Sequence, residues 1–110
     1  MRSDRERLLD IFDAIESIER YATYGEEQFR NDKLVQIWII HYLEMIGEAS
    51  ARISADLQEL HPEIPWSAIV AMRNAMTHHY FGIDLHQVWD TVQLDLPELK
   101  GQIQVILKNL

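Results

Sequence analysis

The chain has 110 residues, enough for one hydrophobic core, and we expect a single domain over residues 1–110. Its 47% hydrophobic and 25% charged content is typical of a globular protein, and the lack of cysteine excludes disulfides, thiolate metal sites and cysteine nucleophiles. The net charge of −8 argues against broad, non-specific nucleic-acid binding. It still allows a small local cationic cleft or a basic partner protein.

Residues 1–7 are charged and lack the apolar stretch of a signal peptide. The longest apolar run, residues 37–40, is far too short to span a membrane. We therefore expect a cytoplasmic protein with no membrane partner.

The first predicted helix begins at Ser3 or Asp4, either of which can cap it. Apolar residues at spacings of three and four then follow one face, and Gly25 is a plausible end of the helix.

The second predicted helix runs from Asn31 or Asp32 to about Leu60, before the first of two prolines. It carries two apolar stripes: Leu34, Ile37, Trp38, His41, Met45, Ala49 and Ile53 on one side, and Val35, Ile39, Tyr42, Leu43 and Ile46 on the other. A helix that is apolar on two sides must bury both. In so short a chain this predicts a homodimer or higher homo-oligomer. It also makes His41 a core histidine rather than a ligand.

Pro65 and Trp66 open a third helix that stops at Gly82. Asp84 then caps a fourth helix, and Pro97 suits the first turn of a last one. The pattern predicts an all-α fold, an up-and-down bundle of four to five helices.

A polar segment, residues 73–80, interrupts the third helix with a cation, an amide, a hydroxyl, two imidazoles and a phenol. The candidate site residues are Arg73, Asn74, Thr77, His78 and Tyr80. The structural alternative is that Arg73 pairs with a carboxylate such as Glu48, while His78 and Tyr80 only pack. For the cluster as a whole, we prefer the interpretation that these residues form a functional site.

Helical geometry places Arg73 and Tyr80 on nearly one face, whereas Arg73 and His78 diverge by roughly 140°. Either the helix loosens just before Gly82, or a second protomer completes the site. His78 and the adjacent His79 point to different sides of a helix, which is poor geometry for one metal ion. We therefore predict no metal and no cofactor.

Several segments in order resemble the HEPN ribonucleases of the HepT type. They are Ile-Gly-Glu-Ala at 46–49, Ile-Pro-Trp at 64–66, Met-Arg-Asn at 72–74, His-His-Tyr-Phe at 78–81, Ile-Asp at 83–84, Trp89 and Asp-Leu-Pro at 95–97. The resemblance covers the chain from Arg5 to about Leu99. One departure is His79, where family members often carry glycine.

The resemblance implies an all-helical, dimeric HEPN domain that acts as the toxin of a HepT–MntA type toxin–antitoxin pair. Such toxins are metal-independent endoribonucleases, and their partner, a small MntA-type nucleotidyltransferase antitoxin, adds AMP to the motif tyrosine, here Tyr80. In RNA cleavage by an internal 2′-hydroxyl, His78 is the natural base. Arg73 can meet the charge on the phosphate with bidentate donors. Asn74 and Thr77 would support them.

Two alternatives remain. The first is a non-catalytic HEPN subunit that binds a nucleotidyltransferase or nucleic acid. The second is a plain dimeric helical adaptor that uses its long apolar helix.

Overall fold

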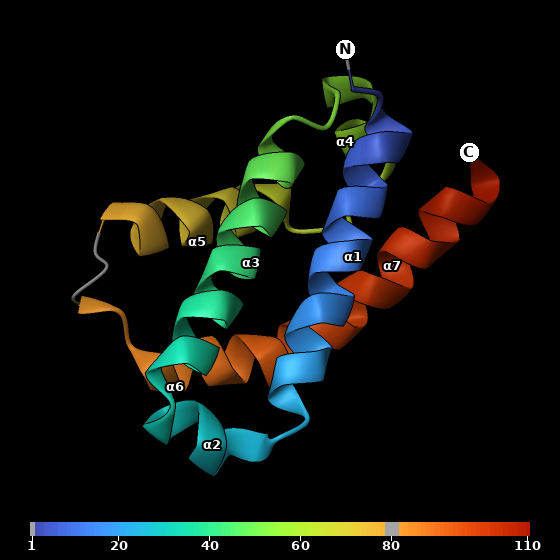
Figure 1. The fold of residues 1–110 in the computed structure, drawn as a ribbon. Coiled ribbons are helices and arrows are strands. Elements are labelled where there is room, and N and C mark those ends of the chain that lie inside the picture. The colour runs from blue at the N-terminus through green and yellow to red at the C-terminus, as the bar shows by residue number, and fades with distance from the viewer. Residues whose placement is uncertain (1, 79–81) are drawn as a thin grey trace.

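The computed structural model describes residues 2–78 and 82–110, and every regular element within them is helical (Figure 1). The elements are α1 (Asp4–Ala22), α2 (Gly25–Asn31), α3 (Lys33–Ala51), α4 (Ala55–Leu60), α5 (Trp66–His78), α6 (Leu85–Asp90), a π-helical turn (Thr91–Asp95) and α7 (Leu96–Asn109). Helix α3 runs antiparallel to α1 and packs on both α1 and α5, and α7 packs against α1. The predicted all-α bundle is therefore confirmed.

Local capping signals explain where the two longest helices begin. The Ser3 hydroxyl accepts the Glu6 N–H at 3.1 Å, and the Glu6 carboxylate accepts the Ser3 N–H at 3.1 Å. This reciprocal pair is a capping box. The backbone hydrogen bond from Ser3 lowers the pKa of Glu6. At α3, the Asp32 carboxylate accepts the Leu34 N–H at 3.0 Å. Both predicted helix starts are confirmed.

The core is one cluster of apolar side chains to which all seven α-helices of the described residues contribute, with most of its aliphatic members on α1, α3 and α7. Its fully buried members include Leu8, Ile11, Ile15 and Ile18 of α1, Ile39, Leu43 and Ile46 of α3, and Ile103 of α7. Burying side chains of this kind is the main stabilising term of the fold. The Phe29 and Trp89 rings, 5.4 Å apart, hold α2 against α6.

The predicted second helix is too long: α3 ends at Ala51, and α4 is a separate helix. Ser54 caps α4 by accepting the Leu57 N–H at 3.2 Å. The Asp4 carboxylate at the start of α1 accepts the Ser54 N–H and hydroxyl. These bonds hold the chain in a turn where the helix would otherwise continue.

The role predicted for Gly25 is also wrong. Helix α1 ends at Ala22, and Gly25, with φ of 91°, begins the short helix α2. Because side chains other than glycine are disfavoured at positive φ, this residue lets the chain reverse direction between the two helices.

The predicted fourth and last helices form one continuous helical segment. The Asp84 side chain caps α6 as expected, accepting the His86 N–H at 2.9 Å. No break follows, because residues 91–95 widen into a π-helical turn, where the Leu96 N–H bonds to the Thr91 carbonyl. In a regular α-helix the Pro97 ring would collide with the carbonyl four residues earlier. The wider turn admits the proline without ending the helix.

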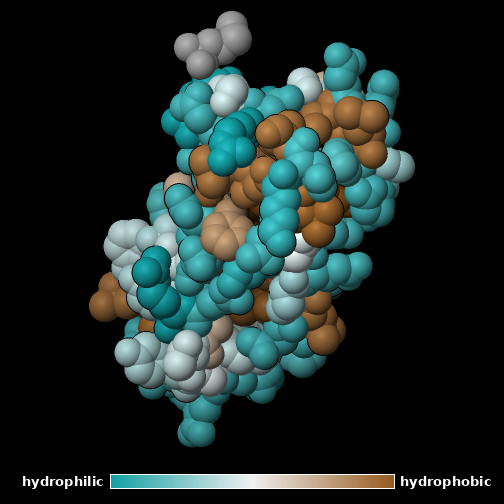
Figure 2. All heavy atoms as spheres, turned by 90° about the vertical axis from the view of Figure 1, so that its right-hand side faces the viewer, coloured by the Kyte–Doolittle hydropathy of each residue, from teal (hydrophilic) through white to brown (hydrophobic). Residues whose placement is uncertain are grey.

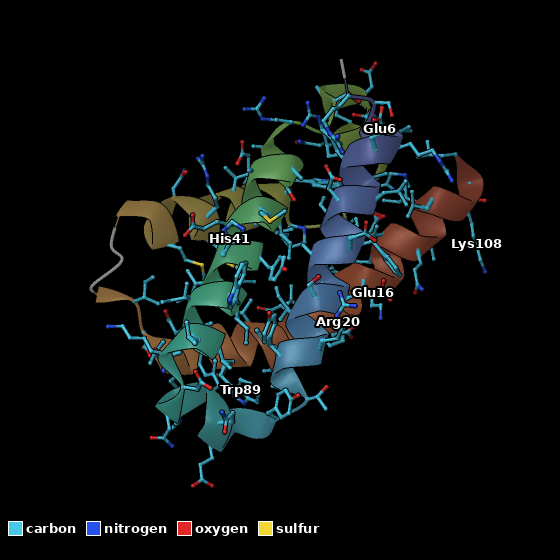
Figure 3. All side chains as sticks on the ribbon, in the orientation of Figure 1. Glu6, Glu16, Arg20, His41, Trp89 and Lys108 are labelled. Atoms are coloured by element: carbon cyan, nitrogen blue, oxygen red, sulfur yellow. The ribbon has the colours of Figure 1, made fainter. Side chains whose placement is uncertain are left out.

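Only one of the two predicted α3 stripes is buried as a whole. Val35, Ile39, Leu43 and Ile46 lie in the core, and Tyr42 beside them is half-buried. On the other stripe, the five positions from Leu34 to Met45 are exposed, and burial begins only at Ala49. His41 lies on this exposed side of α3 (Figure 3), so the prediction of a core histidine is wrong.

The face formed by α1 and α7 mixes hydrophilic and hydrophobic groups (Figure 2). Leu9, Val105 and Leu110 are its exposed large apolar residues. Among the residues that the structure describes, no helix is both long and apolar enough to cross a membrane.

Candidate functional site

Helix α5 carries the polar segment and is anchored near both ends. At its start the Trp66 side chain is buried, and its ring N–H donates to the His61 carbonyl at 3.0 Å. Three turns later Met76 is buried as well. Because the two anchors fix the helix, the residues between them have defined positions against α3.

Arg73 is half-buried, and no carboxylate pairs with it within residues 2–78 and 82–110. Its Nη1 donates to Asn74 Oδ1 at 2.9 Å. Glu48, the expected partner under the structural alternative, instead lies 3.5 Å from the Arg52 guanidinium. That alternative is wrong for Arg73. Asn74 is exposed, and its bond to the guanidinium is a role that sequence reasoning missed.

Gly47, in the last two turns of α3, packs directly against Arg73. A Cβ built on Gly47 would fall 2.1 Å from the Arg73 Cβ and 2.8 Å from its Cγ. The close approach of the two helices therefore depends on the missing side chain. The sequence signal was a glycine inside an apolar helix, which costs roughly 0.5–1 kcal/mol relative to alanine. Among the described glycines, only Gly25 has a positive φ, so backbone conformation does not explain Gly47.

Helix α5 stays helical through His78, five residues beyond Arg73. Positions at this spacing diverge by roughly 140° on an α-helix. The alternative of a helix that loosens near residues 78–80 falls largely outside the described residues. The side chains of Thr77 and His78 are not described, and the predictions for His79 and Tyr80 lie outside the described residues.

The charge around Arg73 differs from that of the chain as a whole. Helix α5 contains no Asp or Glu, although the chain has 18 acidic and 10 basic residues. A helix without carboxylates repels an anion less than the rest of this acidic chain does. In the described part of the chain, no three His, Asp or Glu side chains are close enough together to hold a metal ion.

Two of the hollows beside α5 differ in the charge of their lining. One of about 390 Å³ separates α5 from α6 and includes Met76, Gly82 and the carboxylate residue Asp84. The other, of about 370 Å³, lies between α5 and the end of α3 and includes Asn74 and Ser67. Only neutral residues line the second hollow, so a phosphate would meet less repulsion on this side.

Comparison with known proteins identifies the family of this chain. The family model described as "Ribonuclease HepT-like" matches residues 11–106. The chain is 44% identical over 108 residues to "Probable ribonuclease HepT" of Thermococcus cleftensis, covering 97% of this chain and 98% of that protein. It is 35% identical over 104 residues to "Putative RNase MJ1216" of Methanocaldococcus jannaschii, covering 94% and 86% of the two chains. No solved structure matches.

The sequence comparisons place this all-helical chain among ribonucleases. The chain belongs to the HepT-like ribonuclease family.

Proposed function

We propose that this chain is a metal-independent endoribonuclease, the toxin of a HepT–MntA type toxin–antitoxin system. Membership of a ribonuclease family supports RNA cleavage as its activity. The observation that carries the proposal is Arg73, a half-buried cation without a carboxylate partner in the described residues, on a helix without acidic residues. In an acidic protein, a cation kept clear of carboxylates is suited to an anionic substrate.

The proposed reaction uses the RNA itself as the nucleophile. His78 takes the proton of the 2′-hydroxyl, whose oxygen forms a bond to phosphorus. The bond from phosphorus to the 5′-oxygen breaks, leaving a 2′,3′-cyclic phosphate and a 5′-hydroxyl. Arg73 stabilises the charge on the phosphate oxygens through two parallel N–H donors. Asn74 holds the guanidinium, and Thr77 supports the phosphate.

The site is proposed to be completed by a second copy of the chain. Because Arg73 and His78 diverge on one helix, a second His78 from the partner protomer would protonate the leaving 5′-oxygen. The exposed apolar residues of α3, Leu34, Ile37, Trp38 and Met45, support a homodimer through this face. The Tyr21 ring, parallel to the Trp38 ring at 6.5 Å, extends the same surface onto α1.

Tyr80 is the proposed regulatory residue. A partner nucleotidyltransferase of the MntA type would add AMP to its phenol oxygen. This adds a bulky anion close to the cation that must receive the substrate phosphate, so the site is blocked sterically and by charge. Co-expression with the nucleotidyltransferase, followed by peptide mass analysis, should place the AMP increment on Tyr80. An unmodified Tyr80 in a neutralised pair would indicate simple occlusion instead.

The test of the activity is cleavage of RNA by the purified chain in EDTA. Arg73→Ala and His78→Ala should each abolish cleavage with unchanged helical content, whereas His79→Ala should matter less. The product should carry a 2′,3′-cyclic phosphate. A requirement for Mg²⁺ or Mn²⁺, or a 5′-phosphate on the downstream fragment, would overturn the mechanism. A folded chain that binds RNA without cutting it would favour the non-catalytic subunit.

A further inference from the structure

The contact between α3 and α5 is closest where Gly47 meets Arg73. Besides the two side-chain atoms, the Arg73 Cα would lie 3.3 Å from a Cβ added to Gly47. Carbon atoms in ordinary contact are about 3.5–4.0 Å apart. Any side chain at position 47 would therefore push the stem of Arg73 away by about 1–2 Å and its backbone by less than about 1 Å.

The first part of the Arg73 side chain packs on α3 at Gly47. Its Cβ and Cγ lie over Gly47, whereas its guanidinium reaches Asn74 on its own helix. The α3 surface therefore sets where the side chain leaves the backbone and in which direction it starts. Leu43 and Ser50, about one turn before and after Gly47 on α3, are both fully buried.

We propose that Gly47 is a positioning residue for Arg73: its missing side chain lets α3 clamp the arginine stem so that the guanidinium is aimed at the substrate phosphate. The inference rests on the proposed catalytic role of Arg73. It assigns no chemistry to Gly47, which acts only through the arginine. A misplacement of about 1 Å at a reacting group can lower a rate by roughly 10²-fold.

Alanine substitutions at two helical glycines test the proposal in the full-length chain. Gly47→Ala should lower kcat for RNA cleavage by roughly 10²-fold per folded molecule, with a smaller change in KM. Gly101→Ala in α7 is the matched control, because nothing lies within 4 Å of a Cβ added there. It should keep native kcat. Ile18→Ala, a core variant in α1, should lower Tm but leave kcat per folded molecule unchanged. Native kcat in folded Gly47→Ala would overturn the proposal.

A thermal unfolding cycle tests the contact without using activity. Gly47→Ala should lower Tm strongly in the native chain. It should lower Tm much less in a chain that also carries Arg73→Gly, because that substitution removes the Cβ and Cγ that the new methyl group would contact. If Gly47→Ala does not fold, the double variant should, and a double variant that also fails to fold would overturn the proposal. Another outcome is that the two substitutions are coupled in Tm while Arg73→Ala still cleaves RNA fully. That result would support the Gly47–Arg73 contact and reject the proposed catalytic role of Arg73.

Discussion

Asp4, in the first turn of α1, bonds to Ser54, fifty residues later in the chain. Its two carboxylate oxygens accept the Ser54 N–H at 2.9 Å and the Ser54 hydroxyl at 2.6 Å. Ser54 in turn caps α4. One carboxylate therefore joins the N-terminus of the chain to the turn that separates α3 from α4.

Asp4→Ala should destabilise the fold by roughly 1–2 kcal/mol, because it removes two bonds to a charged acceptor and loosens the cap of α4. Chemical unfolding followed by circular dichroism measures the change. The double variant with Ser54→Ala should lose less than the sum of the single losses, because the two residues act as one unit. Additive losses would show that the two residues are not coupled.

This bond also explains an error in the prediction of the helices. The starts at Ser3, Asp32 and Asp84 were predictable because each depends on a side chain within three residues of the backbone it caps. The end of α3 was not, because it depends on Asp4, and apolar periodicity continues past the turn. Pairing between distant residues is invisible to a local pattern.

The same distinction applies to the candidate site. Arg73 and Asn74 could be singled out because their chemistry is unusual in a bundle helix, and the structure shows them bonded to each other. Their roles in RNA cleavage stay predictions. The part played by Gly47 was not predictable, because it depends on where α5 crosses α3. Pro97 lies in the first turn of α7, as predicted from the sequence. The predicted break before it is absent, because the wider π-helical turn accommodates the proline ring.

Lys100 should stabilise the contact between α7 and α1 in a pH-dependent way. Its ammonium donates to Glu19 at 2.8 Å and lies 5.5 Å from the centre of the Phe12 ring. The hydrogen bond to Glu19 raises the pKa of Lys100 above its ordinary value of 10.5. The stabilisation is therefore fully present below that value and is lost as pH rises through the folded-state pKa.

Lys100→Met should lower the free energy of unfolding by about 1 kcal/mol at neutral pH. It should also remove the part of the native chain's loss of stability at high pH that comes from deprotonation of Lys100. Unfolding measured from about pH 9 to 12 checks both effects. Glu19→Gln should also weaken the pH dependence. An unchanged profile in both variants would contradict the assignment.

Ser50 is fully buried in α3, and within the described residues its hydroxyl has no hydrogen-bond partner. An unpaired buried hydroxyl is unfavourable, so Ser50→Ala should leave stability unchanged or raise it by up to about 1 kcal/mol. Thermal unfolding provides the measurement. A loss of more than about 1 kcal/mol would mean that the hydroxyl is satisfied in solution, for example by a water molecule.

The proposed dimer calls for substitutions outside the core. Ile39 and Leu43 are fully buried, so a glutamate at either position should unfold the chain rather than divide a dimer. Ile37→Glu and Met45→Glu change exposed positions of α3 and should give a folded monomer. Light scattering with circular dichroism measures both properties. Val105→Glu, at an exposed position of α7, is the control and should keep the native mass. A native chain that is monomeric at micromolar concentration would argue against the dimer.

Asn74 should govern how well the Arg73 guanidinium is held. The 2.9 Å bond from Arg73 Nη1 to Asn74 Oδ1 fixes one edge of the planar group and leaves its other donors for a phosphate. Asn74→Ala should therefore reduce kcat for RNA cleavage by about tenfold, while Arg73→Lys should abolish cleavage because an ammonium lacks the planar fork.

Asn31→Ala, which removes an amide bonded to its own helix in α2, is the matched control and should keep native kcat. Because Asn74 is exposed, its loss should change stability little, so a drop in kcat is separable from unfolding. Full activity in Asn74→Ala would mean that the guanidinium is oriented by α3 alone.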